Sequence, residues 1–133
     1  MTDMIFDRLK NHTQNPQLIK LCNRCREYLI DQLTNTLPEN GKLKQGCRAS
    51  FTNLIKQWSI HKCGLGIVQS YKGDDMRALE IFATFPDGSG YEMKNFLIHG
   101  TNDQLISFLQ NDTLTTEMIE TFESFSAGIS EKM

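Results

Sequence analysis

The stretch ALEIFATFPDGSGYEMKNFLI, residues 78–98, decides the fold of this chain. In its first part Leu79, Ile81 and Ala83 recur at every second position, which is typical of a strand that buries one face. The segment Pro86–Gly90 is a strong turn signal, because proline presets φ and glycine accepts positive φ. Residues 91–98 then return as a further strand, so the stretch predicts two antiparallel strands joined by a turn.

Two more features complete the predicted sheet. The apolar phase of the returning strand slips near Asn95, which indicates a β-bulge. Upstream, residues 65–71 alternate loosely and end in a turn signal at 72–75. The sequence therefore predicts a three-stranded antiparallel meander over about residues 65–98.

Phe82 is the one apolar residue on the polar phase of its strand. Its position indicates that the second face of the sheet is covered as well, or that this face forms an interface. Because many helices are expected, we favour burial of Phe82 beneath them.

Three helices are expected before the meander. Residues 3–12 have helical spacing, and a second helix runs from Asn15-Pro16 to about residue 35, with Asn as cap and Pro at the first helical position. A third helix is expected over about 42–62. Its apolar face would carry Leu43, Cys47, Phe51, Leu54, Ile55 and Trp58.

Two helices are expected after the meander. Thr101 and Gln104 fit a capping box at the start of the first. The second spans about 115–127, with Gly128 as its stop. The chain is thus predicted to be a single α+β domain, residues 1–133, in which the meander packs against three N-terminal and two C-terminal helices.

Length and composition indicate a cytoplasmic protein. A chain of 133 residues is long enough for one domain with a sizeable core. It has no run of about 18 apolar residues, and its N-terminus lacks the basic and apolar regions of a signal peptide. In the cytoplasm its four cysteines would be reduced thiols.

The charges are sorted along the chain. Residues 40–73 carry six cations and no carboxylate, whereas residues 74–133 carry eleven carboxylates and three cations. The first 39 residues hold five of each sign, so the net charge of −2 hides +6 in the centre and −8 in the last part. Because fields of one sign steer oppositely charged molecules, this pattern points to charged partners.

The acidic part predicts a non-enzymatic protein-binding module without a cofactor. Glu117, Glu120 and Glu123, with Asp112, are the candidate partner-binding residues, and the expected partner is a basic protein. In size, acidity and layout the chain resembles small bacterial partner-binding proteins such as toxin-neutralising immunity proteins. This resemblance implies an inhibitor that neutralises its partner.

The basic part supports an alternative function, a regulator that binds nucleic acid. Lys44, Arg48 and Lys56 would form a ridge along the helix expected over 42–62 and contact phosphates. The acidic total charge and the scarcity of interleaved aromatic residues oppose this hypothesis. In a third interpretation, these cations are solvated or pair with the acidic C-terminal helices.

Cys22 and Cys25 form the only pattern typical of a metal or redox site. Together with Cys47 and Cys63, or with His61, they could bind zinc. Both thiols fall within a helix and on its apolar stripe, so we favour buried core residues over a zinc or redox site. No metal site is predicted.

The histidines give no catalytic candidate. His61 and Cys63 are too close along the chain to face each other, and no nearby carboxylate would orient the ring. His99 lies in a turn before a helix, and His12 lies near the end of the first helix. We therefore expect no catalytic residues.

Overall fold

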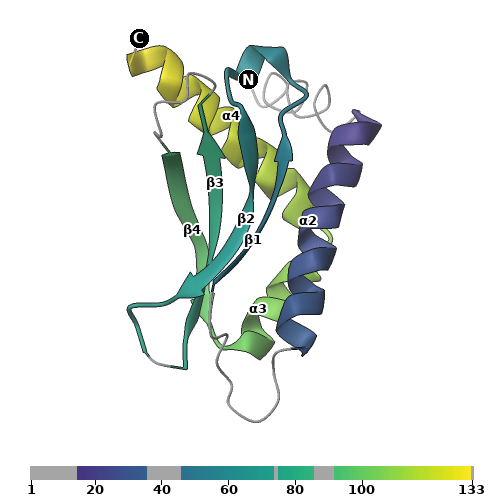
Figure 1. Ribbon diagram of the computed structural model, residues 1–133, viewed down its shortest axis with the longest axis vertical. Helices are drawn as coiled ribbons and strands as arrows, with labels where there is room; N and C mark the ends of the chain where they lie inside the picture. Colours follow the sequence, from purple (N-terminus) through teal and green to yellow (C-terminus); the bar gives the residue numbers. More distant parts are fainter. Residues whose placement is uncertain (1–14, 36–45, 74, 86–91, 133) are drawn as a thin grey trace.

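The computed structural model describes residues 15–35, 46–73, 75–85 and 92–132. These ranges form an α+β fold in which one antiparallel sheet packs against three α-helices (Figure 1). The helical elements are α2 (Pro16–Asn35), the short 3-10 turn η1 (Lys56–Trp58), α3 (Asn102–Leu109) and α4 (Leu114–Lys132). The strands are β1 (Cys47–Thr52), β2 (Lys62–Gln69), β3 (Arg77–Thr84) and β4 (Glu92–Gly100). The helix expected at 3–12 and the turn expected at 86–90 lie outside the described residues.

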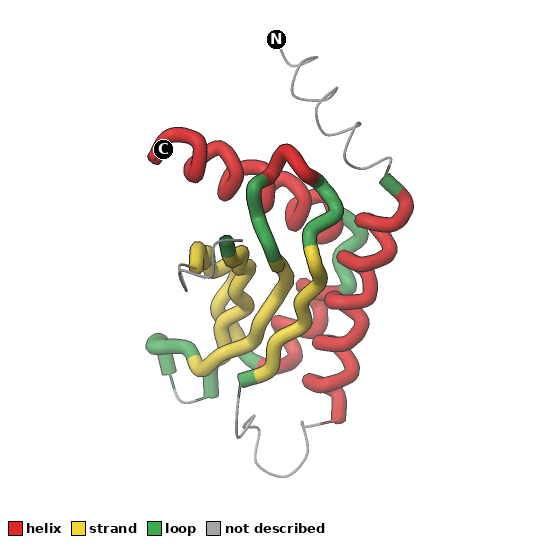
Figure 2. The backbone as a smooth tube through the Cα atoms, turned by 45° about the horizontal axis from the view of Figure 1, so that its top comes forward, coloured by secondary structure: helices red, strands yellow, loops and turns green. Residues whose placement is uncertain are grey.

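The four strands lie in the order β1-β2-β3-β4, and each neighbouring pair is antiparallel. The expected meander is therefore present as β2, β3 and β4, and β1 adds a fourth strand to it. All three α-helices of the described ranges lie on one face of the sheet, which leaves the other face without a helix (Figure 2). We call these the helix face and the outer face.

The prediction of a helix over residues 42–62 is wrong. Residues 47–52 form β1, residues 56–58 form η1, and β2 begins at Lys62. In β1 the odd-numbered residues Cys47, Ala49 and Phe51 are more buried than the residues between them, as in a strand. Cys47 and Phe51 fit a helical period equally well, because so short a segment can satisfy both periods. Pairing with β2 decides the outcome, and it is not a local property.

The helix expected from Asn15-Pro16 is confirmed as α2. The backbone amides of Gln17 and Leu18 donate to Asn15 Oδ1 at 3.1 and 3.2 Å, which satisfies two N–H groups of the first turn. The buried residues of α2 all belong to the predicted apolar stripe: Leu18, Cys22, Cys25, Leu29 and Leu33.

The two expected C-terminal helices are confirmed as α3 and α4. The capping box is present, since the Thr101 amide donates to Gln104 Oε1 at 2.8 Å and the Gln104 amide donates to Thr101 Oγ1 at 3.3 Å. The predicted stop at Gly128 is wrong, because α4 continues to Lys132. Gly128 keeps the helical backbone and lies against the side chain of Met93 instead of ending the helix.

The β-bulge expected near Asn95 is present two residues further along β4. Phe96 pairs with Glu80 and Ile98 pairs with Leu79, so Leu97 is the extra residue of β4. The extra residue accounts for the break in the alternation of apolar and polar residues that the sequence shows near this point.

The core lies between the helix face and the three helices. Leu65 and Ile67 of β2 and Ile81 of β3 are fully buried there. At one end, the ring of Phe122 in α4 lies 6.0 Å from that of Phe51 and 5.8 Å from that of Trp58, measured between centroids. These aromatic contacts hold α4 against β1 and η1. No helix in the described ranges combines the length and the apolarity that crossing a bilayer requires.

Candidate functional site

The outer face carries an ion-pair network of four residues. Arg48 of β1 contacts Glu80 of β3 at 3.4 Å and Glu92 of β4 at 3.1 Å. Lys94 lies 3.3 Å from Glu92 and 4.0 Å from Glu80. The side chain of Glu80 is only 3% exposed, so the two cations compensate a buried carboxylate. With two charges of each sign, the network is neutral as a whole.

Gly66 allows this network to cross the sheet. It pairs with Arg48 on one side and with Glu80 on the other, and it places no side chain between them. The Arg48 guanidinium also lies 4.2 Å above the ring of Phe82. Phe82 is therefore buried, as predicted, with 2% of its surface exposed. The residue that covers it is an arginine and not a helix.

The three candidate nucleic-acid-binding residues do not share the expected ridge. Arg48 lies in β1 and Lys56 in η1, and Lys44 is outside the described residues. Arg48 pairs with carboxylates of β3 and β4, not with the acidic C-terminal helices. The nucleic-acid hypothesis thus loses the helix on which it depended.

Asp112, Glu117 and Glu120 are exposed around the first turns of α4, and we call these three residues the acidic surface. None of them forms an ion pair with another described residue. Arg26 lies in the same shallow hollow as Asp112, but it donates to the backbone carbonyl of Asn111 at 3.1 Å. Glu123 differs from the three, because it is half-buried and its Oε1 is withdrawn from solvent.

Cys22 and Cys25 are buried in the core, as predicted; Cys63 is buried as well, and Cys47 is half-buried. Burial, with a smaller contribution from Cys25, raises the pKa of Cys22 to about 12, and burial raises the pKa of Cys25 to about 11. Burial also raises the pKa of Cys63 and Cys47. Thiols that keep their protons are poor nucleophiles and poor metal ligands. Within the described part of the chain, no three His, Cys, Asp or Glu side chains are grouped so as to hold a metal ion.

His99 makes a contact that sequence reasoning missed. Ser70 Oγ lies 2.8 Å from His99 Nδ1, and the backbone amide of Lys72 donates to the same Oγ at 3.0 Å. The imidazole ring lies 5.2 Å from the rings of Tyr71 and Phe96. A Ser–His pair can belong to a nucleophilic site. Here Ser70 is buried, and its hydrogen bond from the Lys72 amide is typical of a turn. We therefore interpret the Ser70–His99 pair as a structural contact that stabilises the turn between β2 and β3.

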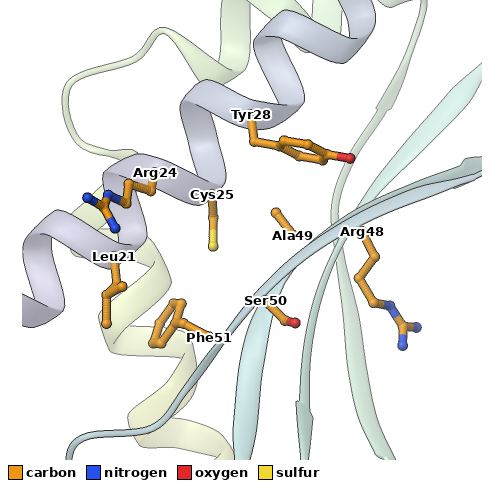
Figure 3. A pocket seen from close by; sticks show the side chains of 8 residues that line it. All are labelled: Leu21, Arg24, Cys25, Tyr28, Arg48, Ala49, Ser50 and Phe51. Atoms are coloured by element: carbon orange, nitrogen blue, oxygen red, sulfur yellow. The ribbon is translucent and has the colours of Figure 1, made fainter.

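A groove of about 540 Å³ separates α2 from β1 (Figure 3). Its lining residues are Leu21, Arg24, Cys25 and Tyr28 of α2 and Arg48, Ala49, Ser50 and Phe51 of β1. The side chains of Arg48 and Ser50 point away from α2, so apolar groups form most of the groove (Figure 3). Tyr28 extends from α2 toward β1 and remains 46% exposed.

One sequence signal could have indicated this groove. Leu21 and Tyr28 belong to the helical apolar stripe of α2, yet neither is fully buried in the core. A stripe that is wider than the core requires indicates a second contact surface on the same helix.

The groove lies beside an open edge of the sheet. Within the described residues β1 pairs only with β2, and its six residues contain neither a proline nor a bulge. The opposite edge, β4, carries the bulge at Leu97 and the charged residues Glu92 and Lys94. Bulges and charges are the features by which edge strands resist the addition of another strand. β1 has no bulge, and its one charged residue, Arg48, is engaged by Glu80 and Glu92, so β1 is the edge better suited to accept a strand.

No protein-family model, no curated protein and no solved structure matches this chain. The assignment of a function therefore rests on the geometry of these surfaces.

Proposed function

We propose that this protein is a non-enzymatic protein-binding module that engages a basic partner through the acidic surface of Asp112, Glu117 and Glu120. The observation that supports the proposal is the contrast between two sets of charges. Arg48 and Lys94 are paired with carboxylates within the sheet, whereas the three carboxylates of the acidic surface have no ion pair among the described residues. Their field is therefore available to an external cation.

An acidic surface of this kind acts mainly on the rate of association. Complementary charges steer two proteins together at low salt and exclude partners of the wrong sign. Such a surface can imitate the phosphates that a nucleic-acid-binding protein recognises. Neutralisation of a basic toxin, in the manner of a small bacterial immunity protein, is the form of binding that we favour.

The double variant Glu117→Gln/Glu120→Gln tests the proposal. The wild-type protein is first used at low salt to capture its partner from the source cells, and the partner is identified by mass spectrometry. Stopped-flow association is then measured with the purified pair between 20 and 300 mM salt. We expect the variant to associate about tenfold more slowly at low salt and to show a flatter salt dependence, with little change in the dissociation rate.

The matched control is Asp31→Asn/Asp75→Asn, which removes two exposed carboxylates that do not line the hollow containing Asp112. It should keep the wild-type association rate to within about twofold, since steering depends on charges close to the contact. An acidic partner, or equal slowing by both double variants, contradicts the proposal.

A further inference from the structure

The free edge of β1 presents a regular row of backbone groups. Asn53 donates to the carbonyl of His61 at 2.9 Å, and this bond continues the β1–β2 register past the end of β1. Because bonded and non-bonded pairs alternate in an antiparallel ladder, the odd-numbered residues of β1 exchange hydrogen bonds with β2. The even-numbered residues Arg48, Ser50 and Thr52 therefore direct their N–H and C=O groups away from the sheet.

The groove provides the second half of a strand-addition site. α2 runs beside the free edge of β1, as Figures 1 and 3 both show. An extended segment paired with β1 would turn every second side chain toward the helix face, and thus into the groove. Ala49 is small and leaves depth beside Cys25, while Leu21 and Tyr28 form the opposite wall. Apolar side chains at alternate positions of the segment fit this space.

The charge of the groove determines whether a bound segment should be acidic or basic. Its lining contains two arginines and no carboxylate. Arg48 is already neutralised by Glu80 and Glu92 on the outer face, but Arg24 is exposed and forms no ion pair with a described residue. Glu27, one turn further along α2, does not line the groove; it shares a neighbouring hollow with Arg24 but forms no ion pair with it. A carboxylate of the bound segment would therefore find a free guanidinium in Arg24.

We propose that the groove binds an extended acidic segment of a partner protein by strand addition to β1, with alternate apolar residues against Leu21, Cys25 and Tyr28 and a carboxylate on Arg24. Strand addition of this type obtains affinity from main-chain hydrogen bonds and specificity from alternate side chains. A second copy of the chain fits less well, because its own α2 would have to share the narrow space beside the edge. The groove and the acidic surface are built from different elements, so this site is independent of the proposed function.

The first step of the test is the selection of phage-displayed peptides that bind the full chain. A random dodecapeptide library on phage is selected against the folded protein at 50 mM salt, and the most enriched sequence is synthesised with a fluorescent label. We expect enriched peptides with apolar residues at alternate positions and at least one Asp or Glu. Absence of any enriched peptide, or enrichment of basic peptides, overturns the proposal.

Charge specificity is then measured by fluorescence anisotropy. We expect Arg24→Gln to raise the Kd of the selected peptide about tenfold, because a charge-assisted hydrogen bond is lost. Lys20→Gln, the matched control, removes a cation of α2 that does not line the groove and should change the Kd by less than about twofold. Equal effects of the two variants contradict recognition by Arg24. The Glu117→Gln/Glu120→Gln variant should bind the peptide as the wild type does, which separates this site from the acidic surface.

Backbone pairing is tested on the peptide, so that the fold of the protein is not disturbed. N-methylation is introduced at one peptide residue at a time. In strand addition only every second amide of the peptide faces β1, so binding should be lost at alternate residues and kept at those between them. A loss at every residue, or at none, overturns strand addition. As a second arm, Ser50→Pro removes an amide that faces the free edge and should abolish binding while the chain stays folded by NMR.

Discussion

Gly64 and Gly66 lie in β2, where glycine is usually unfavourable because it loses more backbone entropy on folding than other residues. A Cβ on Gly64 would overlap with the carbonyl oxygen of Ala49 and lie 2.7 Å from the Cα of Ser50. A Cβ on Gly66 would lie 2.9 Å from Glu80 Oε1. The first glycine therefore permits the close approach of β1, and the second permits the ion pair that crosses β2.

We expect Gly64→Ala to lower the free energy of unfolding by about 1–3 kcal/mol, because the added methyl group forces backbone atoms of β1 to move. Urea unfolding followed by circular dichroism measures the change. Gly128→Ala is the control with the opposite sign. Its Cβ would meet only Met93 at 3.4 Å, so alanine should stabilise α4 by about 0.5–1 kcal/mol. Wild-type stability of Gly64→Ala would show that β1 does not lie so close to β2.

At the residue scale, the sequence predicted positions that depend on local periodicity. Cys22 and Cys25 were expected in the core because they share the stripe of α2, and they are there. Burial of Phe82 was also predicted, but the residue that covers its ring was not. Arg48, which lies over Phe82, comes from a strand that the sequence pattern assigned to a helix.

At the scale of elements, the predictions succeeded where a cap or a turn marks a boundary. Asn15 and the Thr101 capping box define the starts of α2 and α3 without reference to the rest of the fold. β1 has no such local signal, and its six residues adopt a strand because they pair with β2. The wide apolar stripe of α2 could indicate a second contact surface on that helix, but the strand that forms the other wall of the groove, and its free edge, could not be predicted once residues 47–52 were read as a helix.

The packing of α4 on β1 and η1 depends on the aromatic ring of Phe122. We expect Phe122→Ala to lower the free energy of unfolding by about 3–5 kcal/mol, since it leaves a cavity between Phe51 and Trp58. Urea unfolding monitored by the fluorescence of Trp58, the only tryptophan, reports the loss directly. Phe108→Ala in α3 is the control, because Phe108 is only half-buried and should cost clearly less. Similar losses in the two variants contradict a central role for Phe122.

At the scale of the whole molecule, the sequence predicted that charges are sorted but not which of them meet. Sorting is a property of composition along the chain, whereas pairing depends on sheet register. The register places Arg48 opposite Gly66, which itself pairs with Glu80, and so brings the guanidinium of the exposed Arg48 into contact with two carboxylates of the same sheet. The acidic surface keeps its charge because no described cation forms an ion pair with its three carboxylates.

The buried thiols make the stability of the whole molecule depend on pH. In the unfolded chain a thiol ionises near pH 8.5, whereas Cys22 and Cys25 keep their protons in the fold up to pKa values of about 12 and about 11. Stability is therefore complete below about pH 8 and falls above about pH 8.5, by up to about 1.4 kcal/mol per pH unit for each buried thiol. Urea unfolding at pH 7.0, 8.0, 9.0 and 9.5 measures the slope.

Cys63→Ala provides the matched comparison for this slope. It removes one of the buried thiols, so its stability should fall less steeply than that of the wild type between pH 8.5 and 9.5, whatever its stability at pH 7. Identical slopes in the two proteins would mean that other groups cause the loss.

The hydrogen bonds of α2 have a consequence for the order in which the chain folds. Thr115 donates to Asn23 Oδ1 at 2.7 Å, and Arg26 donates to the carbonyl of Asn111. These partners are separated by 92 and 85 positions along the chain. The packing of α2 is therefore complete only after the segment that contains Asn111 and Thr115 has been synthesised. Contacts of such long sequence separation slow folding. During synthesis, the first helix of the described fold would thus be among the last to gain its final contacts.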